Sequence, residues 1–130
     1  MLKGSCLCGA IAYEITGELA EMGHCHCHMC QKAHGAAFGT YGMVQWHEFS
    51  LVKGEDQLGK YQSSDVITRS FCKQCGSTLQ FIRANSPAFG LAVGTLDSAA
   101  GIMPSYQIWT DSKAPWCELE QGIKSYPNGG

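Results

Sequence analysis

The distribution of cysteine constrains this chain more than any other feature of its sequence. Eight cysteines occur in 130 residues; seven fall into three tight groups, whereas Cys117 stands alone. The amino-terminal segment lacks the basic start, apolar middle and cleavage site of a secretory signal, so we expect a reducing, cytoplasmic setting. Reduced cysteines at short, regular spacings are more often metal ligands than disulfide partners. The sequence therefore predicts metal sites rather than a disulfide framework.

Two of the groups fit a single closed metal site. Cys72 and Cys75 are separated by two residues and followed by Gly76, a spacing that presents both sulfurs to one zinc. A closed tetrahedral site needs four ligands, and the obvious second pair is Cys6 and Cys8, which is also followed by glycine. We predict a structural zinc on these four cysteines, which would clip a long loop. The alternative is a buried cysteine cluster that holds no metal.

The third group lies in the stretch GHCHCHMCQ, residues 23–31, where histidines alternate with cysteines. In an extended segment, neighbouring side chains point to opposite faces. One metal could not easily take both sets, so either the cysteines or the histidines bind. We favour the cysteines, because thiolate is the softer ligand and a turn after the second cysteine would bring the third one round. The cysteines are Cys25, Cys27 and Cys30, and the histidines are His24, His26 and His28.

Three protein ligands leave one corner of a tetrahedron open, which is typical of catalytic zinc. A zinc ion on three thiolates has a formal charge of about −1 and should be a weak Lewis acid towards water. A thiol entering the open corner would lose its proton and keep an electron-rich sulfur. The site therefore suits chemistry on a thiol better than hydrolysis. The alternative is that a fourth ligand, such as His34, closes the site and makes it structural.

The rest of the chain indicates an all-β protein. Sixteen glycines separate short segments of apolar or β-branched alternation, which predicts curled antiparallel sheets in a sandwich-like arrangement, stapled by the structural zinc. We expect a single domain over residues 1–130 and one short helical turn at His28–His34, after the second cysteine cluster. The expected strands are Ala10–Ile15, Leu19–Cys25, Ala37–Tyr41, Phe49–Lys53, Gly59–Gln62, Val66–Phe71, Thr78–Ile82, Leu91–Gly94 and Tyr106–Trp109.

Charge and hydropathy exclude two classes of partner. The chain has nine basic and eleven acidic residues and no basic run, so the electrostatic footprint of a nucleic-acid-binding protein is absent. No long uncharged apolar stretch could span a bilayer. We therefore expect neither nucleic acid nor membrane as a partner.

The order of these motifs resembles the glutathione-dependent formaldehyde-activating enzyme family, which also includes centromere protein V-like domains. The resemblance runs through GSCLCGAIAYEITG, HCHCHMCQKAHGAAFGTY, FSLVKGEDQLGKYQSS and RSFCKQCGSTLQF, and continues in VGTLD and IWTDSKAPW. It implies an all-β fold with two zinc ions per chain. The implied ligands are Cys6, Cys8, Cys72 and Cys75 for the structural zinc, and Cys25, Cys27 and Cys30 for the catalytic zinc.

The resemblance also implies an activity, the addition of glutathione to formaldehyde, classed as a carbon–sulfur lyase for the reverse direction. We therefore expect an enzyme acting on adducts of a small thiol and a small aldehyde, with a homodimer as one expected assembly. The alternative is a two-zinc scaffold without turnover. Gln31 and Gln107 stand where the family usually has arginine and histidine, which leaves the substrate open. The candidate proton donors are His24, His26, His28 and His34.

Overall fold

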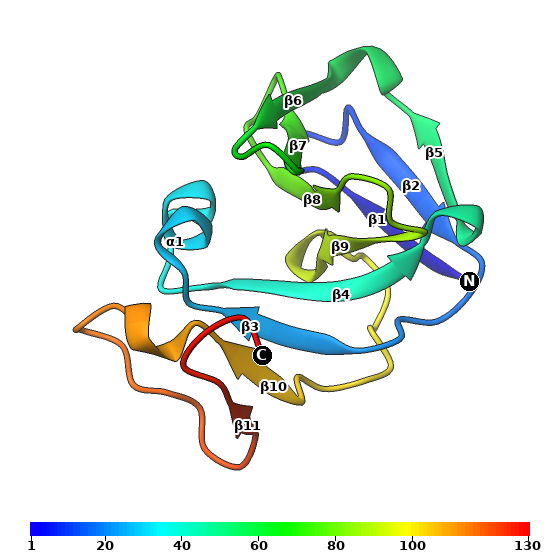
Figure 1. The fold of residues 1–130 in the computed structure, drawn as a ribbon. Helices are drawn as coiled ribbons and strands as arrows, with labels where there is room; N and C mark the ends of the chain where they lie inside the picture. Colours follow the sequence, from blue (N-terminus) through cyan, green and yellow to red (C-terminus); the bar gives the residue numbers. More distant parts are fainter.

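The computed structural model describes residues 1–130 and contains two β-sheets and one α-helix (Figure 1). Three strands, β1 (Leu2–Ser5), β2 (Ala12–Ile15) and β5 (Phe49–Lys53), form the smaller sheet in the order β1-β2-β5. Eight strands form the larger sheet: β3 (Met22–Cys25), β4 (Gly39–Gln45), β6 (Leu58–Gln62), β7 (Ile67–Cys72), β8 (Thr78–Arg83), β9 (Ala88–Ala92), β10 (Tyr106–Ile108) and β11 (Lys124–Ser125).

The order of the larger sheet, β11-β10-β3-β4-β9-β8-β7-β6, brings distant segments side by side. Most neighbours are antiparallel, as expected, but β10 pairs in parallel with both β3 and β11. Four short 3₁₀ helices connect strands, and no helix has the length and apolar character needed to cross a bilayer. The 3₁₀ helices are Trp46–Glu48, Glu55–Gln57, Val93–Thr95 and Thr110–Ser112.

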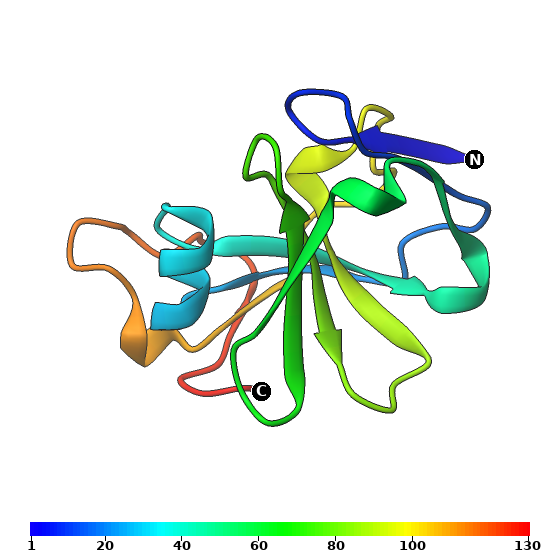
Figure 2. The same cartoon turned by 90° about the horizontal axis from the view of Figure 1, so that it is seen from above.

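The main core contains side chains of both sheets, whose strands Figure 2 shows from above. Tyr13 and Ile15 are buried and alternate with half-buried neighbours on β2, as expected for a strand with one face in the core. Every residue of β9 is buried, because this strand lies inside the larger sheet with both faces covered. Its Phe89 and Leu91 pack in the same cluster as the β2 side chains. The predicted all-β fold is confirmed.

The single α-helix, α1 (His28–His34), has the predicted bounds. Cys27 is its N-cap, and the thiol of Cys27 accepts the backbone N–H of Cys30 at 3.3 Å. Gly35 ends the helix in the left-handed region, at φ 59°, and its N–H returns to the carbonyl of Gln31. Cys30 is the one buried residue of the helix. This short helix therefore mainly serves to turn the third cysteine of its cluster inward.

Candidate metal centres

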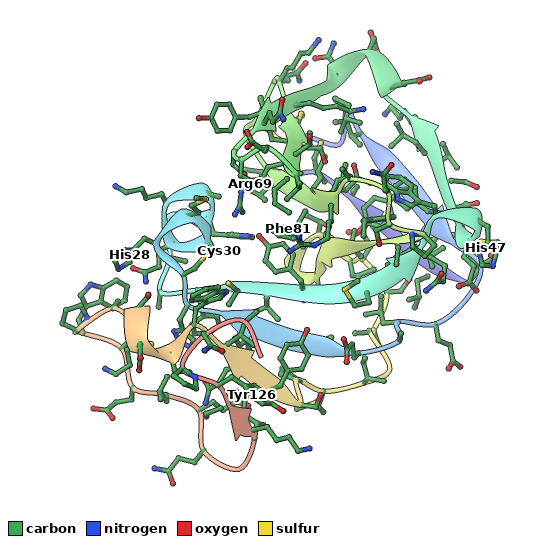
Figure 3. All side chains as sticks on the ribbon, viewed as in Figure 1. His28, Cys30, His47, Arg69, Phe81 and Tyr126 are labelled. Carbon is green, nitrogen blue, oxygen red and sulfur yellow. The ribbon has the colours of Figure 1, made fainter.

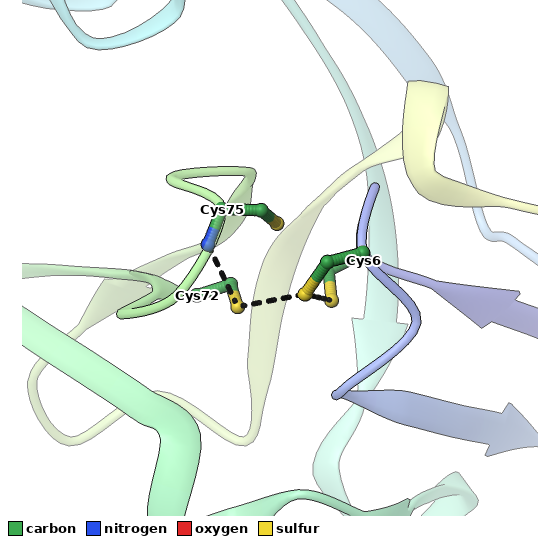
Figure 4. A group of neighbouring side chains, drawn as sticks. Cys6, Cys72 and Cys75 are labelled. Atoms are coloured by element: carbon green, nitrogen blue, oxygen red, sulfur yellow. Dashed lines mark hydrogen bonds between the residues drawn. The ribbon is translucent and has the colours of Figure 1, made fainter.

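The first cluster brings the four predicted cysteines together (Figure 4), with all their sulfurs within 4.8 Å of one another. The Sγ atoms of Cys6 and Cys8 are 3.7 Å apart, and those of Cys8 and Cys72 are 3.8 Å apart. Four zinc–sulfur bonds of about 2.3 Å in a tetrahedron would place the sulfurs about 3.8 Å from one another. A disulfide needs about 2.05 Å. The arrangement thus fits a tetrahedral metal and excludes disulfides.

Two matching turns build this cluster. The β1–β2 turn and the β7–β8 turn each place a glycine after their second cysteine, Gly9 at φ 78° and Gly76 at φ 81°. Each glycine donates its N–H back to the carbonyl of the first cysteine of its own turn. The backbone N–H of Leu7 also donates to the hydroxyl of Ser77 at 2.9 Å, which ties one turn to the other. The cluster therefore joins the smaller sheet to the larger one.

The second cluster has three sulfurs, all from one short segment. Cys25 ends β3, Cys27 caps α1 and Cys30 lies in the first turn, and their sulfurs are within 4.8 Å of one another. No histidine, aspartate, glutamate or further cysteine joins this group. Cys25 and Cys30 are buried, whereas Cys27 is half-buried. The geometry thus provides three protein ligands for a metal and no fourth.

The histidines do not form a metal site of their own. His24 and His26 point away from the sulfurs, as strand alternation predicts, and their rings lie 4.3 Å and 5.0 Å from the ring of Phe38. His24 contacts Thr40 and Glu120, at 2.8 Å and 3.2 Å. His28 begins α1 and is exposed. The cysteines thus lie together and the histidines lie apart from them, and the choice of the cysteines as metal ligands stays a prediction.

Proton sharing inside the second cluster is uneven. Without a bound metal, hydrogen bonds from Cys25 and Cys30 lower the pKa of the Cys27 thiol to about 2. The bonds to Cys27 and Cys30, together with burial, raise the pKa of Cys25. The first negative charge of the cluster therefore resides on Cys27, the sulfur with the most access to solvent.

A buried arginine accompanies this charge. Arg69 of β7 points towards α1 (Figure 3), and its Nη1 and Nη2 each lie 3.8 Å from Cys30 Sγ. The guanidinium also stacks over the ring of Phe81, at 5.1 Å. Burial opposes the positive charge, but the bond to Cys30 and the nearby thiolates outweigh it and raise the pKa of Arg69. Neither ion pair of the structure includes this arginine, so its anionic partners are the sulfurs.

Tyr41 links the cluster to His34. Its hydroxyl lies 3.7 Å from Cys30 Sγ, 3.4 Å from Arg69 Nη1 and 2.7 Å from His34 Nε2. A side chain at Gly39 would clash here, because its Cβ would lie 2.6 Å from His34 Nε2. Burial, and then the charge of Arg69, lower the pKa of His34. His34 is thus a neutral partner of Tyr41 and does not join the sulfurs as a fourth ligand.

Sequence reasoning gave Arg69 and Tyr41 no role. A signal was available for Arg69, because it shares the buried phase of β7 with Ile67, where a charged residue needs a partner. No such signal pointed to Tyr41, because its contact with Cys30 depends on the turn that leads into α1.

Gln31 and Gln107, which stand where the family usually has arginine and histidine, connect the carboxy-terminal segment to the site by hydrogen bonds. Gln31 Nε2 donates to the carbonyls of His26 and Ser112, at 2.7 Å and 2.9 Å. Gln107 is fully buried, and its Nε2 donates to the carbonyl of Glu120 at 2.9 Å. Their amide donors are therefore engaged within the protein, which argues for a structural role at both positions.

Two pockets flank α1. One, of about 480 Å³, lies between the carboxy-terminal end of the helix and the first cluster, and its lining includes His34, Phe38 and Cys75. The other, of about 420 Å³, lies between α1 and the β6–β7 edge. Its lining residues are Met29, Lys32, Ala33, Tyr61, Ser63 and Arg69.

Fold and site together define a small β-protein with two cysteine clusters able to hold metal ions, one of four sulfurs and one of three. The profile of the family described as glutathione-dependent formaldehyde-activating enzyme matches residues 1–112. The chain belongs to this family, which confirms the resemblance seen in the sequence.

Several known proteins are similar to this chain. An uncharacterized lyase of Schizosaccharomyces pombe is 35% identical over 83 residues, 64% of this chain and 58% of that protein. A Podospora anserina protein named "putative glutathione-dependent formaldehyde-activating enzyme" is 37% identical over 66% of this chain and 42% of its own length. These matches thus cover about half of each relative. The crystal structure of a Rhodobacter sphaeroides protein, 25% identical, superposes with a TM-score of 0.64 over 95% of this chain and 98% of that one.

Proposed function

We propose that this protein is a zinc-dependent enzyme of the carbon–sulfur lyase type. It joins a small thiol such as glutathione to a small aldehyde such as formaldehyde, and it splits the adduct in reverse. The observation that carries this proposal is the cluster of three sulfurs with no fourth protein ligand. Family membership and the names of the relatives support the substrates.

We assign the structural zinc to the first cluster and the catalytic zinc to the second. The second zinc, when bound, would supply a position at which a thiol sheds its proton and remains nucleophilic. Arg69 offsets the negative charge of the three cysteine sulfurs, so a further anionic sulfur can approach. We treat residues 1–130 as one domain, because the core side chains of both sheets pack in one cluster.

The addition transfers one proton from sulfur to oxygen. The carbon–sulfur bond forms, the carbonyl π bond breaks, and the thiol proton ends on the new hydroxyl group. His34 is the histidine best placed to carry this proton, because it lines the 480 Å³ pocket and is held neutral beside the cluster. Tyr41 has one hydroxyl hydrogen and two acceptors, His34 Nε2 and Cys30 Sγ. When that hydrogen points to His34 Nε2, the neutral ring carries its own proton on Nδ1.

Exchange spectroscopy of formaldehyde and glutathione tests the proposal. The wild-type protein should accelerate exchange between free and adduct forms, and Cys27→Ser should lose this acceleration. Cys117→Ser is the matched control, because Cys117 lies outside both clusters. Equal exchange rates for wild type and Cys27→Ser would remove the assignment as an enzyme.

The second candidate function is a two-zinc scaffold without turnover. Full burial of Cys30 and the hydrogen bonds around it would also suit a rigid structural site. Zinc per chain, measured by plasma mass spectrometry before and after a mild chelator, separates the two. Selective loss of one of two zinc ions favours the open site, whereas two equally inert ions favour the scaffold.

A further inference from the structure

The pocket between α1 and the β6–β7 edge is lined by two basic side chains, Lys32 and Arg69, and by two hydroxyl groups. None of its six lining residues is acidic. Lys32 is exposed, and its ammonium has no ion-pair or hydrogen-bond partner. The hydroxyl of Tyr61 also has none, and this side chain is 64% exposed. Met29 and Ala33 supply the apolar part of the wall.

The innermost groups of the pocket also have donors to spare. A guanidinium has five N–H groups. Those of Nε and Nη1 reach Ser63, Tyr41 and Cys30, and one on Nη2 reaches Cys30, so one N–H of Arg69 Nη2 remains. The Ser63 hydroxyl accepts from Arg69 Nε at 3.1 Å, and its own hydrogen has no acceptor in the protein. An anion in this pocket would therefore meet several unused donors.

The same guanidinium connects this pocket to the second cysteine cluster. Arg69 lines the pocket and lies 3.8 Å from Cys30 Sγ, so one small molecule could place a sulfur at the cluster and an anionic group in the pocket. Carboxylates accept hydrogen bonds from arginine, lysine and hydroxyl groups. Glutathione carries its glycyl carboxylate one residue away from its thiol.

We propose that this pocket, the anion pocket, binds a carboxylate of the thiol substrate through Lys32, Ser63 and Arg69. The proposal rests on the proposed function for the presence of a thiol at the cluster. It extends that function by specifying the substrate class: a thiol that carries a carboxylate is preferred over one that does not. Lys32 and Ser63 act by positioning the substrate, because neither contacts the cluster.

Binding of S-methylglutathione tests the anion pocket without turnover, because its blocked sulfur has no proton to lose. Calorimetry on the zinc-loaded protein at low ionic strength should show about a 5- to 10-fold higher Kd for Lys32→Gln than for wild type, a change within the usual range for losing one hydrogen bond. Lys32→Arg should restore binding. Lys60→Gln is the matched control, because Lys60 is exposed on β6 beside Tyr61 but does not line the pocket.

Two further ligands identify the source of the anion. The dimethyl ester of S-methylglutathione, which lacks both carboxylates, should bind at least about 10-fold more weakly than the parent. Equal binding of the ester, or equal binding by wild type and Lys32→Gln, would overturn the proposal. Inorganic phosphate that binds as tightly as S-methylglutathione would reduce the pocket to a general anion site and overturn the substrate assignment.

The outcome is separable from that of the proposed function. Carboxylate-dependent binding that Lys32→Gln weakens, in a protein that does not accelerate formaldehyde exchange, would support the anion pocket and refute the enzyme. Accelerated exchange by the wild-type protein, together with unchanged binding in Lys32→Gln, would support the enzyme and refute the anion pocket.

Discussion

The two cysteine clusters use the same ligand atom in opposite ways. The first takes two sulfurs from each of two turns, with Cys8 and Cys72 separated by 64 positions. Its other contacts are backbone N–H groups and serine hydroxyls. The second takes all three sulfurs from residues 25–30 and is surrounded by Arg69, Tyr41 and a pocket on either side of α1. The first cluster joins distant parts of the chain, whereas the second brings together three sulfurs of one short segment without a fourth protein ligand.

The comparison shows that surroundings, as well as sulfur count, distinguish such sites. A zinc ion on four thiolates would have a formal charge of about −2, and the exposed Cys8 would leave this charge open to solvent at the first cluster. The second cluster has two of its three sulfurs buried, and the positive charge beside them is the buried guanidinium of Arg69. A fixed positive charge can replace the hydration that an anion loses when it moves from water into the site.

The largest expected difference lies in stability. Cys72→Ser should prevent folding, because structural zinc contributes about 10–16 kcal/mol in small domains and total stabilities are about 5–15 kcal/mol. Cys27→Ser should keep the fold, since its cluster joins no distant segments. Urea unfolding followed by circular dichroism checks both, with Cys117→Ser as the control. Equal stability of Cys72→Ser and Cys27→Ser would contradict the division of roles.

The next effect concerns proton transfer at the second cluster. His34→Gln should slow formaldehyde–glutathione exchange by about 100-fold, the lower range for general acid–base catalysis. Burial and Arg69 lower the pKa of His34 from its ordinary value of 6.5. The titration of His34 should therefore leave the wild-type exchange rate constant above pH 6.5. Below pH 6.5, the rate should fall as His34 becomes protonated. His34→Gln should lack that fall.

His28→Gln provides the control for this pH profile, because His28 is exposed at the start of α1. It should match wild type in both rate and profile. An unchanged acidic limb in His34→Gln would assign the proton transfer to another group.

A smaller effect is expected on metal affinity. Arg69→Gln removes the cation beside Cys30 and should weaken zinc binding at the second cluster by about 10- to 100-fold, as for other groups that support metal ligands. Competition with a chromophoric chelator measures this, and the first cluster should be unaffected. Arg83→Gln, which changes an exposed arginine on β8, is the control. Equal weakening at both clusters would mean that Arg69 supports the fold rather than the site.

The smallest expected effect is a loss of stability at two glycines whose backbone lies in the left-handed region. Gly76→Ala and Gly35→Ala should each cost about 1 kcal/mol, because both positions have positive φ and an added Cβ would meet no atom within 4 Å. Thermal unfolding measures both. A much larger loss for Gly76→Ala would show that the turn geometry at the first cluster also controls metal binding.

The sequence predicted the parts of this molecule that depend on short spacings. The bounds of α1 and of β5 match the expected ones, because a cysteine cap, a left-handed glycine and an alternating run are local patterns. Two strands were missed. Strand β1 carries no clear alternation in LKGS, and β11 has two residues, so each is defined only by the partner that it meets.

The grouping of the cysteines was predictable from the sequence, and their surroundings were not. Which cysteines group together follows from spacing, whereas the approach of Arg69 to Cys30 depends on how β7 faces α1. That relation is set by tertiary packing between segments 39 positions apart. The parallel pairing of β10 with β3 was also beyond local patterns, because both strands are short and their partners lie far apart in sequence.

Because of that parallel pairing, the surroundings of the second cysteine cluster are completed late during synthesis. Cys25 is the register partner of Ile108 on β10, and the N–H of His26 donates to the carbonyl of Ile108. Ile108 leaves the ribosome long after both. Pairing across such a sequence separation is slow in refolding as well. In a nascent chain, the backbone beside these three thiols therefore lacks this partner until β10 is made, and early capture of zinc would shield the thiols from oxidation before that strand arrives.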